Sequence, residues 1–171
     1  MKEKIKIGEQ IQKKIDESGK KQKWLAEKMC ESESKISRIC QNEHINTKDL
    51  IPICIHLECN FFELYANYID RHIPKENSIS LSYIYKFVTG NEIHIGKLIK
   101  KIKKERKIQA EILANKIGCS EKNIYKLYKR KNMNTAQLIV LSKHLKFNFF
   151  ELYAEFVDEQ IQKKRLLGSN P

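Results

Sequence analysis

The second part of this chain repeats the first. Residues 7–69 align with residues 95–157 at a constant offset of 88 positions without a gap, and 24 of the 63 aligned pairs are identical. The longest identical run, Asn60–Ala66, returns as Asn148–Ala154. This repeat is longer than the roughly 20–50 residues of a solenoid unit, so it predicts two copies of a whole domain. We expect these domains over residues 1–70 and 93–157, joined by residues 71–92 and followed by a C-terminal tail over residues 158–171.

Each copy spaces its apolar residues three and four positions apart, which is the period of a helix rather than of a strand. The chain holds only three Pro and six Gly, which also favours helices with short loops over a turn-rich β fold. The fold class is therefore expected to be all-α. The first copy predicts five helices, over residues 5–18, 22–29, 33–41, 47–58 and 61–70, and the second copy predicts their counterparts 88 residues later.

The segment between the copies is too apolar for a free linker. We expect it to form a short helix or strand packed on one domain, and we expect residues 158–171 to continue the last helix and then fray. The apolar residues of the linker are Ile79, Leu81, Tyr83, Ile84, Tyr85, Phe87 and Val88.

Aromatic residues are concentrated in the last helix of each copy. Their density predicts that they fill the core and the junction between the copies, or alternatively pair two chains. They are Phe61, Phe62, Tyr65 and Tyr68 in the first copy, and Phe149, Phe150, Tyr153 and Phe156 in the second.

The net charge of +12 is unevenly distributed. Residues 5–69 hold ten Lys and Arg against ten Asp and Glu, whereas residues 93–157 hold fifteen against five. A basic excess concentrated in one domain indicates a polyanionic partner, with nucleic acid ahead of an anionic membrane surface. A lysine-rich soluble surface with no such partner is the alternative.

Other function classes find little support in the sequence. No run of about 18 apolar residues is present, so we expect no membrane span. Five cysteines at unequal places in the two copies indicate a reducing, cytoplasmic location rather than a disulfide framework. Cys54, His56 and Cys59 have the wrong spacing for a zinc site. With no nucleophile–base pair or phosphate-binding glycine loop either, we expect no enzyme activity, metal, cofactor or small-molecule ligand.

One motif carries a function. Gln22, Leu25-Ala26, Ser32 and Ile36 in the first copy, and Leu113-Ala114, Gly118, Ser120 and Ile124 in the second, stand at the spacing of a helix-turn-helix. The pattern resembles that of the phage repressor/Cro (XRE) family of bacterial transcription regulators. The second copy has Ala110 where the family has Gln, and the first has Cys30 where the family has the turn Gly. The resemblance implies two tandem five-helix repressor-like domains with recognition helices at about residues 33–41 and 121–129.

The resemblance also implies which residues contact double-stranded DNA. Recognition helices of this family enter the major groove, where Arg and Lys suit guanine, Asn suits adenine, and Glu accepts from the cytosine amino group. The implied base contacts are Glu33, Ser34 and Arg38 in the first copy, and Glu121, Lys122, Asn123 and Lys126 in the second. The implied phosphate contacts are Gln22, Lys35, Lys129, Arg130 and Lys131.

The sequence thus predicts a cytoplasmic, nucleoid-associated regulator that binds duplex DNA, with the second copy supplying most of the electrostatic affinity. Self-association is a further possibility. The alternative is a protein-interaction module, such as an antitoxin or an oligomerising regulator, in which the first copy no longer reads DNA. An RNA-binding or membrane-surface protein would explain the charge but not the helix-turn-helix.

Overall fold

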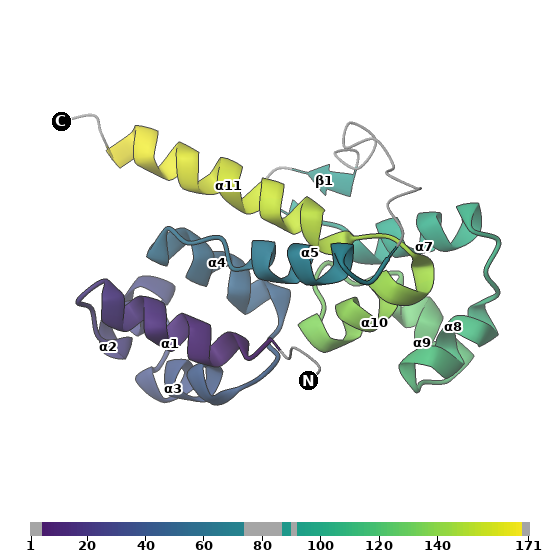
Figure 1. The fold of residues 1–171 in the computed structure, drawn as a ribbon, viewed down its shortest axis with the longest axis horizontal. Coiled ribbons are helices and arrows are strands. Elements are labelled where there is room, and N and C mark those ends of the chain that lie inside the picture. Colours follow the sequence, from purple (N-terminus) through teal and green to yellow (C-terminus); the bar gives the residue numbers. More distant parts are fainter. Residues whose placement is uncertain (1–4, 74–86, 90–91, 169–171) are drawn as a thin grey trace.

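The computed structural model describes residues 5–73, 87–89 and 92–168, and within them it is all-α apart from one short hairpin (Figure 1). We call residues 5–73 the first half and residues 92–168 the second half. The helices of the first half are α1 Ile7–Glu17, α2 Gln22–Met29, α3 Glu33–Gln41, α4 Thr47–Leu57 and α5 Phe62–Asp70. Those of the second half are α7 Ile95–Glu105, α8 Ala110–Ile117, α9 Glu121–Leu127, α10 Thr135–Leu145 and α11 Phe149–Gly168.

The predicted helices are confirmed, and their spacing explains why. In α1 the residues four apart, Ile7, Ile11 and Ile15, are fully buried. Ser32 caps the start of α3, because its Oγ accepts a hydrogen bond of 3.3 Å from the backbone N–H of Lys35. Some boundaries were wrong by two residues: α1, expected from residue 5, begins at Ile7, and the recognition helix expected over residues 121–129 ends at Leu127.

A glycine in each half lets the first helix touch the end of the third. An added Cβ at Gly8 would overlap the carbonyl oxygen of Cys40, and one at Gly96 would overlap that of Leu127. The backbone N–H groups of the two glycines donate to the carbonyl oxygens of Asn42 and Arg130, at 3.0 and 2.9 Å. No side chain fits at this crossing, so the glycines fix where α3 and α9 lie.

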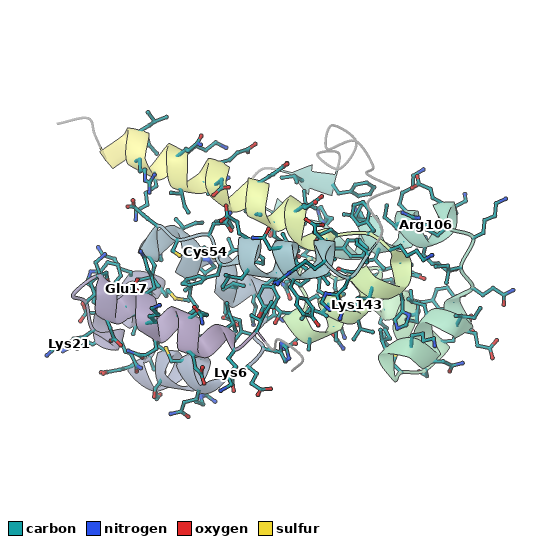
Figure 2. The ribbon with its side chains drawn as sticks, in the orientation of Figure 1. Lys6, Glu17, Lys21, Cys54, Arg106 and Lys143 are labelled. Carbon is teal, nitrogen blue, oxygen red and sulfur yellow. The ribbon has the colours of Figure 1, made fainter. Side chains whose placement is uncertain are left out.

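The two halves share one continuous apolar core rather than forming two separate ones. Helices α5 and α11 pack against each other across the junction, and of the eight aromatic residues predicted to lie there, seven are buried and Tyr68 is half-buried. Tyr68 forms a hydrogen bond across the junction, since Lys143 of α10, labelled in Figure 2, donates to its hydroxyl at 2.8 Å. The prediction that the aromatic residues pack the junction between the copies is confirmed.

The segment predicted as a C-terminal tail is instead the end of α11, which continues without a break to Gly168. It crosses to the first half, where Ile161 is buried and Lys164 donates to the carbonyl oxygen of Ile55 at 3.1 Å. Lys164 and Arg165 also pair with Glu58, at 3.1 and 2.9 Å. The predicted continuation of the helix is confirmed, but the extension is a packed element.

The joining segment is described only in part. Strand β1 (Val88–Thr89) pairs antiparallel with β2 (Glu92–Ile93), and Phe87 and Val88 pack against the core, as the apolar composition predicted. The other apolar residues of this prediction, from Ile79 to Tyr85, lie outside the described residues.

Among the described residues no helix has both the length and the apolar character needed to cross a membrane. Within the same residues no three His, Cys, Asp or Glu side chains lie close enough together to hold a metal ion. Cys54 is fully buried inside the first half (Figure 2), and burial raises the pKa of its thiol well above the ordinary value.

Candidate nucleic-acid interface

In the second half, α8 and α9 form a tight helix-turn-helix. Gly118 ends α8 in the left-handed conformation, with φ +68°, which glycine adopts without strain. The backbone N–H of Cys119 then donates to the carbonyl oxygen of Ala114 at 3.0 Å, and α9 begins directly after Ser120. Ser120 occupies the N-cap position of α9, although its side chain makes no capping hydrogen bond.

Helix α9 buries one face and exposes the other. Ile124 and Leu127 are buried against the core, whereas Lys122 and Lys126, on the opposite side of the helix, are exposed. All four base contacts predicted for this half, Glu121, Lys122, Asn123 and Lys126, lie on the exposed surface. The structure therefore leaves these side chains accessible to a groove, which is what base recognition requires.

Tyr125 belongs to the same face, and the sequence reasoning missed it. Its side chain is 56% exposed, yet it is held in place: the hydroxyl donates to Glu121 Oε1 at 3.3 Å, and the ring meets that of Tyr128 edge-on at 6.0 Å. Helical spacing could have found it, because residues three and four positions after Lys122 share its face. An ordered aromatic side chain beside two lysines adds apolar contact area to the α9 surface.

The basic cluster predicted to contact phosphates follows α9. Lys129, Arg130 and Lys131 are all exposed, and Lys129 lies in the turn after the helix rather than on it. Lys131 Nζ lies 2.5 Å from Glu92 Oε2, with both side chains about half exposed. Exposed pairs contribute only about 0–1 kcal/mol, so Glu92 does not prevent Lys131 from turning to a phosphate.

The first half builds the same turn without the glycine. Cys30 ends α2 with φ +53°, and the backbone N–H of Glu31 donates to the carbonyl oxygen of Ala26 at 2.9 Å, as its counterpart does in the second half. The absence of the turn glycine therefore leaves backbone strain at Cys30 rather than a different turn. The predicted base contacts Glu33, Ser34 and Arg38 are all exposed.

Two predicted phosphate contacts of the first half are already engaged within the chain. Gln22 donates from Nε2 to Gln12 Oε1 at 2.5 Å. Lys35 lies 2.6 Å from Glu31 and 3.0 Å from Asp49, and these carboxylates raise the pKa of its ammonium group. A phosphate that approaches Lys35 would also meet these two carboxylates, which repel it.

Helices α3 and α9 lie along the same edge of the molecule, one in each half, while α11 runs along the opposite edge (Figure 1). The exposed faces of the two helices are thus not covered by the extension of α11. This placement leaves both helices accessible on a common side.

Residues 98–158, from within α7 into α11, match the family model of the Cro/C1-type HTH DNA-binding domain. The match supports a helix-turn-helix of this type in the second half. Searches of the curated proteins and of the solved structures found no match.

Proposed function

We propose that this chain is a sequence-specific, duplex-DNA-binding regulator of transcription that reads bases with α9 and α3. The observation that carries the proposal is the exposed face of α9, where Lys122, Tyr125 and Lys126 stand together on the recognition helix of a DNA-binding domain. A chain with this function acts in the cytoplasm, on the nucleoid.

The side chains of α9 suit the major groove. Lys122 and Lys126 offer ammonium donors to guanine O6 and N7, Asn123 can bond the edge of adenine, and Glu121 can accept from the amino group of cytosine. Helix α3 offers a different set, with Glu33, Ser34 and Arg38. The two helices would therefore prefer different bases.

The second half is proposed to supply most of the electrostatic affinity. Residues 93–157 of the second half hold fifteen Lys and Arg against five Asp and Glu, while residues 5–69 of the first half are balanced at ten and ten. Non-specific affinity for DNA comes from the counterions that Lys and Arg release, so the basic half binds first. The neutral half then adds specificity from a tethered position.

A second candidate function rests on Lys35. Because Glu31 and Asp49 hold this lysine, the α3 surface is less basic than its counterpart, which favours a role for the first half in contacting a protein. In that case α9 alone reads DNA.

The test is selection of bound duplexes from random DNA with the intact chain, followed by the same selection with Arg38→Ala and with Lys126→Ala. We expect a defined motif, with each variant relaxing a base in a different part of it. If Arg38→Ala leaves the motif unchanged, the protein-interaction role of the first half is favoured. No enrichment of any motif by the unmodified chain would reject sequence-specific binding.

A further inference from the structure

We infer that the chain is an internal dimer, in which a pseudo-two-fold axis relates the two halves, and that one chain therefore reads two unlike half-sites in inverted orientation. This inference rests on the proposed function and specifies the form of the DNA site. Its evidence is a set of contacts at the junction that are reciprocal at an offset of 88 residues.

The ring contacts are the first reciprocal set. Phe62 stacks on Tyr153 with ring centroids 4.9 Å apart, and Tyr65 stacks on Phe150 at 4.7 Å. Phe150 is the counterpart of Phe62, and Tyr153 is the counterpart of Tyr65. If residue i meets the counterpart of j, and j meets the counterpart of i, the two surfaces are related by a two-fold rotation and not by a translation.

Buried hydroxyl groups repeat the relation. The hydroxyl of Tyr65 donates a hydrogen bond to Thr135 Oγ1 at 3.2 Å, and that of Tyr153 donates one to Thr47 Oγ1 at 3.4 Å. Both threonines are 0% exposed. Burial raises the pKa of Tyr65 to about 12 and that of Tyr153 well above its ordinary value, so both hydroxyls keep their protons at neutral pH. The same pair of residue types thus meets twice, with the halves exchanged.

Hydrogen bonds donated by two asparagine side chains form a third reciprocal set. Asn60 Nδ2 donates to the carbonyl oxygen of Ala154 at 2.9 Å, and Asn148 Nδ2 donates to that of Ala66 at 3.0 Å. Asn148 is the counterpart of Asn60, and Ala154 is the counterpart of Ala66.

The backbone places the axis. Thr47 N donates to Met133 O and Thr135 N donates to Ile45 O, each at 2.9 Å. Between these bonds Asn46 bridges Asn134, its own counterpart. A residue can face its own counterpart only beside a two-fold axis, so the axis passes between the starts of α4 and α10.

Sequence identity between the halves is concentrated at the junction and is lower on the recognition helices. The junction residues Asn46, Thr47 and Asn60–Ala66 are identical to their counterparts. In the recognition helices Glu33 and Glu121 are identical, but three other positions on the outer face differ: Ser34 corresponds to Lys122, Ser37 to Tyr125, and Arg38 to Lys126. The chain thus keeps a symmetric interface and carries two different reading surfaces.

The geometry has a direct consequence for the DNA. Duplex DNA has two-fold axes perpendicular to its length, so a two-fold pair of recognition helices meets half-sites that run in opposite directions, about 10 bp apart or a multiple of that. Because the readers differ, the half-sites differ too. One chain already supplies both readers, so a single chain per site is sufficient.

The experiment transplants one reading surface onto the other half in the full-length chain. The variant Lys122→Ser, Asn123→Lys, Tyr125→Ser and Lys126→Arg gives α9 the corresponding residues of α3; all four replaced positions of α9 are exposed in the structure. Duplex selection is run on it and on the unmodified chain, and the mass of each complex is measured by light scattering. Lys163→Ala, an exposed lysine of the α11 extension, is the control and should leave the site unchanged.

We expect the unmodified chain to select two unlike, inverted half-sites as one chain per duplex, and the transplant to select a palindrome. A direct repeat from the transplant, or two chains per site, would overturn the internal dimer. Where the transplant binds too weakly to select, the reverse variant of α3, Ser34→Lys, Lys35→Asn, Ser37→Tyr and Arg38→Lys, should select the palindrome of the α9 half-site. If the unmodified chain selects no motif, it is the proposed function that fails.

Discussion

Helices α3 and α9 occupy equivalent places in the two halves, yet they stand in opposite electrostatic settings. Around α3, Lys35 is held by Glu31 and Asp49. Around α9 the corresponding positions carry Asn123, Cys119 and Gln137, and no carboxylate replaces the two acids. After α3 the chain continues with Asn42 and Glu43, whereas after α9 the corresponding residues are Arg130 and Lys131.

The difference shows that the buried positions hold the fold while the exposed positions are free to diverge. Ile36 and Ile124 fill the same place in the core, and Gly8 and Gly96 allow the same close crossing. None of these residues specifies what the surface binds. Two features of the halves can therefore be tested separately. The shared part is the packing of the first helix on the third, and the divergent part is the surface charge around α3 and α9.

The largest effect is expected on the shared part. Gly96→Ala and Gly8→Ala each place a Cβ on a backbone carbonyl oxygen, so the first helix must move away from the recognition helix. Overpacking of this kind costs about 1–3 kcal/mol and occasionally more, and we expect about 3 kcal/mol for each. Urea denaturation of the full chain measures the loss.

Gly168→Ala is the matched control, because nothing lies within 4 Å of a Cβ at that position. The two core glycines should behave alike, since the crossing is the same in both halves. If Gly8→Ala is harmless while Gly96→Ala is not, the halves do not share this packing as the structure indicates.

The difference in surface charge predicts that removing charge after α9 and adding charge after α3 change the salt dependence of DNA affinity in opposite directions. Lys129→Ala with Arg130→Ala should flatten the slope of log affinity against log salt by about 2 on a random duplex, because each phosphate contact contributes about 0.9. The counterparts in the first half, Gln41→Lys with Asn42→Arg, should steepen that slope if α3 lies at the DNA. Fluorescence anisotropy across a salt series measures both.

An unchanged slope for the first-half variant, together with a flattened slope for the second-half variant, would place only α9 at the DNA. The reverse result would contradict the proposed division of electrostatic affinity between the halves.

Variants of the predicted base contacts in the two halves should lower the affinity for DNA by similar amounts, but they should affect different half-sites. Lys126→Ala should cost roughly 1–3 kcal/mol at the preferred site and relax one base of the α9 half-site. Arg38→Ala should do the same in the α3 half-site. Affinities for the selected duplex and for its single-base variants measure the effect. Equal weakening on every sequence would instead identify the residue as a phosphate contact.

Much of the fold follows from local signals in the sequence. Apolar spacing placed the helices to within one or two residues in most cases, because each helix must bury one face. The end of α9 was misplaced because Tyr128, which follows it, is buried and continues the apolar pattern beyond the helix. The packing of α11 on Glu58 and Ile55 could not be predicted, since these residues lie 106 and 109 positions before Lys164.

The candidate site was less predictable than the fold. The resemblance to the family motif placed Lys122 and Lys126 on the outer face of the helix, and both are exposed in the structure. It gave no sign that Lys35 is held by Asp49, because that contact depends on how α4 lies against α3. The repeat itself predicted a junction, but the two-fold relation appears only in which residues meet across that junction, as with Phe62 and Tyr153.

The smallest expected effect concerns the turn that both halves share with different residues. Cys30 and Gly118 end α2 and α8 with φ +53° and +68°. A side chain in this region costs about 1–2 kcal/mol, whereas glycine adopts it freely but loses more entropy on folding. Cys30→Gly should therefore stabilise the chain by about 1 kcal/mol. Gly118→Ala should destabilise it by a similar amount, which is the cost of the backbone conformation alone, since nothing within 4 Å obstructs the added Cβ. Lys146→Gly, at φ +47° after α10, is the control for a left-handed cap outside the helix-turn-helix. Urea denaturation of the full chain measures all three variants. If Cys30→Gly destabilises the chain, then contacts of the Cys30 side chain outweigh the backbone strain at this turn.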